Sequence, residues 1–215
     1  MQATLACLMT LTAWAAAQTV PIEQLGHRIP ASAAGEYRAS TKALEKGKIK
    51  ESIAHCLKAL ESDPDNASAH NDLGVLYLND GQMEKARTEF ERAAALQPRM
   101  VSARVNESFA LLARDSPGEA EAAARKALEI VANDRRAKLL LGWSLRAQFC
   151  YSEEALISLQ SAAREYPEAH LAAADVLIHN GSLAAARQEI QAYLTSGNAD
   201  QKSLAEAWLR MLTFE

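Results

Sequence analysis

The stretch that decides the fold is residues 67–100, ASAHNDLGVLYLNDGQMEKARTEFERAAALQPRM, a segment of 34 residues whose pattern recurs on both sides. Small and apolar residues recur at helical spacing in its first half, a turn follows, and the same spacing resumes in its second half. These positions are Leu73, Gly74 and Tyr77, then Asn79, Asp80 and Gly81 in the turn, then Ala86, Phe90 and Ala93. Because Pro98 cannot continue a helix, the segment predicts two antiparallel helices that end there.

Residue size along this stretch fits the packing of two helices. Gly74 and Ala86 are small where the two helices must approach, and Tyr77 and Phe90 fill the wider parts of the interface. In length and in these small, aromatic and proline positions, the stretch resembles the tetratricopeptide repeat, a helix-turn-helix unit. The resemblance implies an all-α fold, namely a right-handed superhelical solenoid of antiparallel helix pairs with about five such repeats and a C-terminal capping helix.

The register of the repeat can be followed from residue 33 to residue 198, which we predict to be one tetratricopeptide repeat domain. The predicted repeats are 33–66, 67–100, 101–134, 135–167 and 168–198. The fourth carries one extra residue in the turn 149–152, and Tyr193 replaces the usual alanine of the fifth. Residues 199–215 predict the capping helix, with Leu204, Trp208 and Leu212 on the face that covers the last repeat.

The N-terminal residues 1–17, MQATLACLMTLTAWAAA, contain no charged side chain and end in small residues. This pattern predicts a secretory signal peptide and therefore a periplasmic or secreted protein with no membrane span in the mature chain. No Lys or Arg precedes the apolar run, so either the signal is atypical or the true start lies upstream. The alternative is an uncleaved membrane anchor. Residues 18–32 carry two prolines and little periodicity, and they predict an extended leader.

Composition and motifs argue against several functions. The 23 basic and 27 acidic residues are interspersed, so we expect no nucleic-acid partner. The five histidines lie in separate segments, without paired cysteine spacing, so we expect no metal site. Glycine-rich phosphate loops and G-x-S-x-G are absent from the sequence, so we expect no cofactor and no enzymatic activity. Cys56 and Cys150 lie in different repeats, too far apart for a disulfide; we expect Cys56 in the core and Cys150 accessible in a turn.

The resemblance also implies where a partner binds. In tetratricopeptide repeat proteins, the first helix of each repeat lines a concave groove. The residues of this sequence at the groove positions are Asn71, Val75, Leu78, Val105, Phe109, Leu112, Leu139, Trp143 and Arg146. They form an apolar, aromatic trough with polar edges, which is typical of binding surfaces. We therefore predict a non-catalytic, exported protein-protein interaction module that binds a peptide or protein partner of unknown identity in this groove.

The alternative function is a self-assembling structural scaffold, a homo-oligomer whose groove is filled by its own chain at residues 20–29. Some tetratricopeptide domains instead clamp a C-terminal carboxylate. Asn71, Asn106 and Arg136 stand at places of that clamp, but Val75 and Leu140 stand where Asn and a basic residue are needed. The clamp is incomplete, so we do not predict that specificity.

Glu107 departs from the pattern because it stands at a position expected to be buried. A buried carboxylate is costly unless it is paired. Either the helix is rotated locally, or Glu107 has a partner such as Arg104, Arg114 or Arg136.

Overall fold

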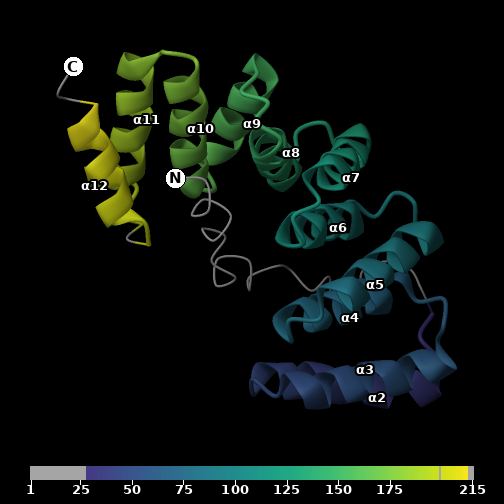
Figure 1. Cartoon of the computed structure of the whole chain (residues 1–215). Coiled ribbons are helices and arrows are strands. Elements are labelled where there is room, and N and C mark those ends of the chain that lie inside the picture. Colours follow the sequence, from purple (N-terminus) through teal and green to yellow (C-terminus); the bar gives the residue numbers. More distant parts are fainter. Residues whose placement is uncertain (1–27, 199, 213–215) are drawn as a thin grey trace. The chain divides into compact units, whose positions relative to one another are not determined.

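The computed structural model describes residues 28–198 and 200–212 (Figure 1). These residues form eleven helices and no strand, so the prediction of an all-α fold is confirmed. The predicted signal peptide 1–17 and most of the predicted leader lie outside the described residues. In the part of the chain that is described, no helix combines the length and the apolar content that a membrane span requires.

The chain divides into two compact units at residue 116, within the predicted repeat 101–134. The first unit contains α2 (Ala31–Glu45), α3 (Ile49–Ser62), α4 (Ala67–Asn79), α5 (Met83–Leu96) and α6 (Val101–Ala113). The second contains α7 (Pro117–Ile130), α8 (Arg135–Ala147), α9 (Glu153–Ala163), α10 (Glu168–His179), α11 (Leu183–Thr195) and α12 (Lys202–Met211). Successive helices pack as pairs, α2 with α3 and α4 with α5 in the first unit, and α8 with α9 and α10 with α11 in the second.

One turn conformation follows the first helix of every repeat. The residue at this place has a left-handed backbone, and in three repeats it is a glycine. The five residues are Gly47, Gly81, Asp115, Phe149 and Gly181. At the second of these turns, the Gly81 N–H donates to the carbonyl of Leu78 at 3.0 Å, and the Gln82 N–H donates to that of Tyr77 at 2.8 Å. The left-handed residue lets the chain reverse while the last helical carbonyls stay hydrogen-bonded.

The small residues at the helix-helix interfaces make room for side chains of the second helix. A Cβ atom placed on Gly74 would lie 2.5 Å from Cε1 of Phe90, and one on Gly142 would lie 2.5 Å from Cγ of Leu159. Phe90 and Leu159 are both fully buried. The predicted close approach is therefore present, with the Phe90 ring and the Leu159 side chain seated directly on the backbone of the first helix.

The last helix closes the second unit, as the amphipathic pattern predicted. Ala205 and Leu212 of α12 join a buried cluster that contains Leu171 of α10 and Ile190 and Tyr193 of α11. Trp208 packs against this cluster while partly exposed, whereas Leu204 is only half-buried. The Tyr193 hydroxyl, with its side chain fully buried, accepts a hydrogen bond from the backbone N–H of Gln201 at 2.9 Å. Tyr193 therefore holds the start of α12 against α11.

The two described cysteines lie in opposite environments, as expected. Cys56 is 2% exposed, and its thiol donates to the carbonyl of Ala69 with a separation of 3.7 Å. Burial, with a smaller contribution from the Asp72 charge, raises the pKa of the Cys56 thiol to about 12. Cys150 is exposed in the turn between α8 and α9.

Candidate partner-binding face

Six of the predicted groove residues lie in the first unit, on the neighbouring helices α4 and α6, which are in contact. Each of these side chains is buried in the structure. They are Asn71, Val75 and Leu78 on α4 and Val105, Phe109 and Leu112 on α6. The structure therefore brings these six together as a mostly apolar set, and their role in binding stays a prediction.

A pair of asparagines connects the two helices of this set. The Asn106 Nδ2 of α6 donates to the Asn71 Oδ1 of α4 at 2.9 Å, and the Asn71 Nδ2 in turn donates to Asp72 at 3.3 Å. Asn71 is 0% and Asn106 is 1% exposed. The Asn106 Oδ1 is buried and has no hydrogen-bond partner among the described residues. Buried polar atoms are normally hydrogen-bonded, so this oxygen is an unsatisfied acceptor.

The other three predicted residues lie in the second unit on α8. Leu139 is fully buried, whereas Trp143 and Arg146 retain partial exposure. The Arg146 Nη1 donates to the Asp175 Oδ2 on α10 at 2.9 Å, and the Arg146 Nε is buried without a partner in the described structure. Arg146 is therefore already paired with a carboxylate rather than free at the edge of a groove.

Asp175 is a residue of this face that the sequence reasoning missed. It is 6% exposed, and it also faces His179, whose Nδ1 lies 3.4 Å from the Asp175 Oδ1. The His179 ring stacks on Tyr151, with ring centroids 3.8 Å apart. The alignment of the repeats could have identified Asp175. When the left-handed Gly181 is aligned with Gly81, Asp175 occupies the position that Val75 has in the second repeat.

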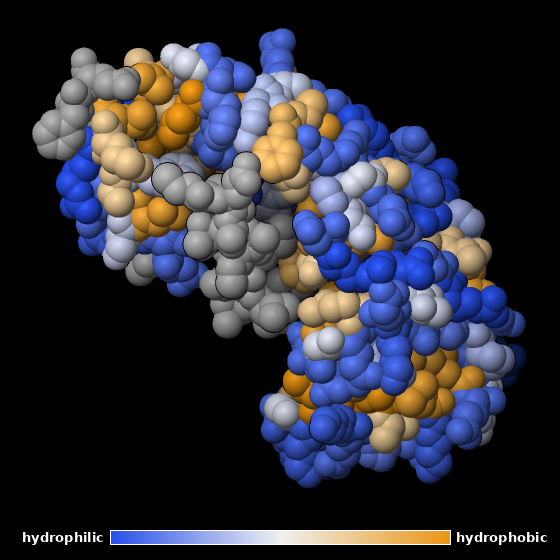
Figure 2. Space-filling view, in the orientation of Figure 1, coloured by the Kyte–Doolittle hydropathy of each residue, from blue (hydrophilic) through white to orange (hydrophobic). Residues whose placement is uncertain are grey.

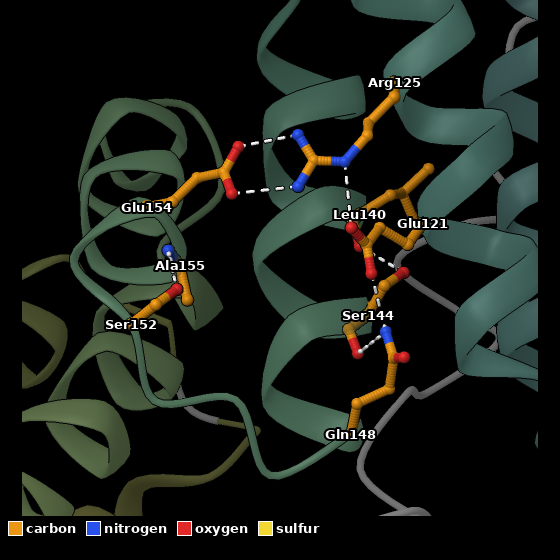
Figure 3. Close-up of polar contacts among 8 residues, drawn as sticks. All are labelled: Glu121, Arg125, Leu140, Ser144, Gln148, Ser152, Glu154 and Ala155. Atoms are coloured by element: carbon orange, nitrogen blue, oxygen red, sulfur yellow. Dashed lines mark hydrogen bonds and ion pairs between the residues drawn. The ribbon is translucent and has the colours of Figure 1, made fainter.

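A polar network holds three helices of the second unit together (Figure 3). Arg125 of α7 donates from Nη1 and Nη2 to Glu154 of α9 at 2.7 and 2.8 Å, and from Nε to Glu121 of α7 at 2.8 Å. Gln148, at the end of α8, donates to the other Glu121 oxygen at 2.8 Å. Hydrogen bonding to Arg125 holds the pKa of Glu154 below its usual value. Each carboxylate of this network has a donor, so we assign it to packing rather than to binding.

Glu107 is paired with one of the three arginines that the sequence analysis named. The side chain is buried, and its Oε2 accepts a hydrogen bond from the Arg104 Nη1 at 2.9 Å, from one turn earlier in α6. This pair explains how a carboxylate is tolerated at a buried position.

The surface agrees with a protein whose apolar residues serve helix packing. On the face seen in Figure 2, hydrophilic side chains cover the outer sides of the helices, and hydrophobic ones gather in the seams between helix pairs.

Among the described residues, no three His, Cys, Asp or Glu side chains lie close enough together to hold a metal ion.

Antiparallel helix pairs that repeat one turn and one set of small residues define the class of helical-repeat proteins. Family comparison is more specific, because three tetratricopeptide repeat models match residues 38–66, 55–88 and 152–202. These matches identify tetratricopeptide repeats in the chain, and this fold is typical of protein-protein interaction modules. No curated protein matches it in sequence.

Solved structures share the fold at low sequence identity. The MamA protein of Desulfovibrio magneticus RS-1 is 17% identical with a TM-score of 0.71, and the match covers 80% of this chain and 100% of that one. YrrB, described as a tetratricopeptide repeat protein with an unusual peptide-binding site, is 19% identical with a TM-score of 0.63, over 76% and 85% of the two chains. The first tetratricopeptide domain of Spaghetti (RPAP3), bound to the HSP90 peptide SRMEEVD, is 22% identical with a TM-score of 0.52, over 55% and 96%.

Proposed function

We propose that this chain is a non-catalytic module that binds an extended peptide segment of a protein partner along α4 and α6. The observation that carries the proposal is the buried Asn71–Asn106 pair, whose terminal oxygen on Asn106 lacks a donor within the described structure. The peptide-binding structures of the same fold support this class of ligand.

The unpaired acceptor and the apolar side chains on α4 and α6 favour an extended peptide as the ligand. A peptide in extended conformation presents main-chain N–H groups to one side, and such an N–H is the donor that the Asn106 Oδ1 lacks. Val75, Val105 and Phe109 belong to the same set of side chains, so the neighbouring peptide residues would be apolar. Leaving a buried carbonyl oxygen unpaired costs about 1 to 3 kcal/mol, which a bound N–H would recover in part.

We propose Leu139, Trp143 and Arg146 as further binding residues, which lie by themselves on α8 of the second unit. Because Arg146 is paired with Asp175, it offers a neutral polar pair rather than a free cation. Export to the periplasm or to the outside of the cell, which residues 1–17 lead us to expect, belongs to the same proposal.

The test is selection of peptides from a random phage-displayed library on the immobilised chain, followed by affinity measurement on the selected peptides. Asn106→Leu keeps the side-chain volume but removes the amide, so we expect at least about tenfold weaker binding, which corresponds to one lost hydrogen bond. Asn133→Leu is the matched control, because Asn133 is exposed in the turn before α8. We expect it to leave affinity unchanged.

The same peptides also address the alternative in which the chain fills its own groove. A chain that begins at Arg28 lacks most of residues 20–29 and would then bind at least about tenfold more tightly. Equal affinity of Asn106→Leu and the unmodified chain, with circular dichroism showing both folded, would rule out the proposed face. Mass that rises with concentration in light scattering would favour the scaffold instead.

A further inference from the structure

Three histidine-carboxylate contacts join the two helices of a pair, each between residues 19 positions apart in the chain. The distances from histidine Nδ1 to the carboxylate oxygen are 2.6 to 2.7 Å. The pairs are His55 with Glu36 between α3 and α2, His70 with Glu89 between α4 and α5, and His170 with Glu189 between α10 and α11. A histidine-carboxylate contact thus recurs in three helix pairs, with the histidine on the first helix for His70 and His170 and on the second helix for His55.

His70 differs from the other two because both of its ring nitrogens face acceptors. Its Nδ1 lies 2.6 Å from the Glu89 Oε2, and its Nε2 lies 2.9 Å from the carbonyl oxygen of Pro64. A neutral imidazole has only one N–H, whereas the imidazolium has two. A carbonyl and an ionised carboxylate can only accept, so this geometry is satisfied in full by the protonated ring.

The charges around His70 favour the same state. The charged groups that act most strongly on its ring are Glu89 and Arg92, both on α5. Arg92 is drawn toward Asp65 in the α3–α4 connection, at 3.2 Å. Burial lowers the pKa of His70, but the hydrogen bonds to Glu89 and Pro64 and the Glu89 charge outweigh it, so the pKa is raised above its usual value.

We infer that His70 is a proton-dependent clamp, which as an imidazolium ties the first turn of α4 to α5 and to the end of the preceding repeat at Pro64, and which loosens when it loses its proton. Loss of the proton removes one of the two donors, so either the Pro64 carbonyl or the Glu89 carboxylate loses its partner. This inference is independent of the proposed peptide binding.

The direction of the pH effect follows from linkage. A histidine whose folded-state pKa is raised binds its proton more tightly in the folded chain than in the unfolded one. The stability from His70 is therefore fully present below the unfolded pKa of about 6.5, and it is lost as the pH rises through the folded-state pKa. Mild acid strengthens the clamp and mild alkali releases it.

The direct test is an NMR titration of the imidazole resonances in the full chain. We expect His70 to titrate above pH ~6.5, and we expect Glu89→Gln, which keeps the shape but removes the charge, to lower this midpoint by at least about half a pH unit. Glu91→Gln is the matched control, since Glu91 lies on the same helix but pairs with Arg87. It should leave the His70 midpoint unchanged.

A stability measurement separates the clamp from a purely structural role. His70→Gln should lower the urea midpoint of unfolding more at about pH 5.5 than at about pH 8.5, because only the protonated ring contributes the clamp. An equal loss at both pH values, or a His70 midpoint at or below ~6.5, would overturn the inference. If His70→Gln does not fold, the Glu89→Gln titration decides alone.

Discussion

At the scale of single residues, the turn between α8 and α9 carries backbone strain. Phe149 adopts a φ of 59° at the place where three other repeats have glycine. A side chain in this left-handed region costs roughly 1 to 2 kcal/mol, because Cβ approaches the following carbonyl oxygen. The ring is 72% exposed, so its burial returns little of that cost.

We predict that Phe149→Gly raises the free energy of unfolding by about 1 kcal/mol, because it relieves the left-handed strain. Urea denaturation followed by circular dichroism measures the change. Gly181→Ala, at the equivalent turn with a φ of 73°, should lower the free energy of unfolding by a similar amount. A less stable Phe149→Gly chain would mean that the ring makes contacts worth more than the strain.

Glu107 shows what the sequence can and cannot resolve at this scale. The repeat register identifies it as a carboxylate at a position expected to be buried, and it leaves open a local rotation of the helix or a partner such as Arg104, Arg114 or Arg136. It could not choose among them, because a partner one turn away in the same helix and partners on neighbouring helices are equally compatible with the spacing. The structure selects Arg104, which needs no contact between helices.

At the scale of helices, the closing of the second unit depends on α11 and α12 together. The sequence predicted a final amphipathic helix and singled out Tyr193 as a departure from alanine. The hydrogen bond between Tyr193 and the start of this helix was not predictable. A tyrosine in place of alanine indicates that a larger volume must be filled, but it does not indicate which segment the hydroxyl contacts. In the structure, the Tyr193 hydroxyl meets the Gln201 N–H just before α12 begins.

We predict that Tyr193→Phe destabilises the second unit by about 1 kcal/mol, the usual contribution of one buried hydrogen bond. The ring remains, so packing around Ile190 and Ala205 is kept. Amide hydrogen exchange should become faster at the start of α12, with a smaller increase in α8 and α9. If exchange were unchanged throughout α12, the hydroxyl would not be what holds that helix.

At the scale of the whole molecule, the helix pairs were predictable because the same local pattern of small and apolar residues recurs in each repeat. The solvent exposure of the groove residues was not predictable, because register assigns a side chain to a face without saying how far that face is covered. Asp175 was missed for a simpler reason. The predicted fifth repeat begins at Glu168, and this register does not align Asp175 with Val75 of the second repeat.

A repeat architecture also predicts how far the destabilising effect of one substitution extends along the chain. Gly74→Val places atoms where the Phe90 ring lies, and overpacking of this kind costs about 3 kcal/mol. Because repeats are stabilised mainly by their nearest neighbours, we expect faster hydrogen exchange in α3 to α6 and unchanged exchange in α10 to α12. A uniform increase across both units would instead show that the chain unfolds as one cooperative body.

The contrast between the two cysteines has a practical consequence for measuring such events. Cys150 is exposed and should react with a maleimide while the chain is folded, whereas the Cys56 thiol is buried and has a raised pKa. Modification of Cys56 therefore requires the first repeat to open. The rate of Cys56 modification therefore reports how often the first repeat opens. Peptide mass spectrometry measures this rate, with Cys150 as the internal reference, and no added label site is needed.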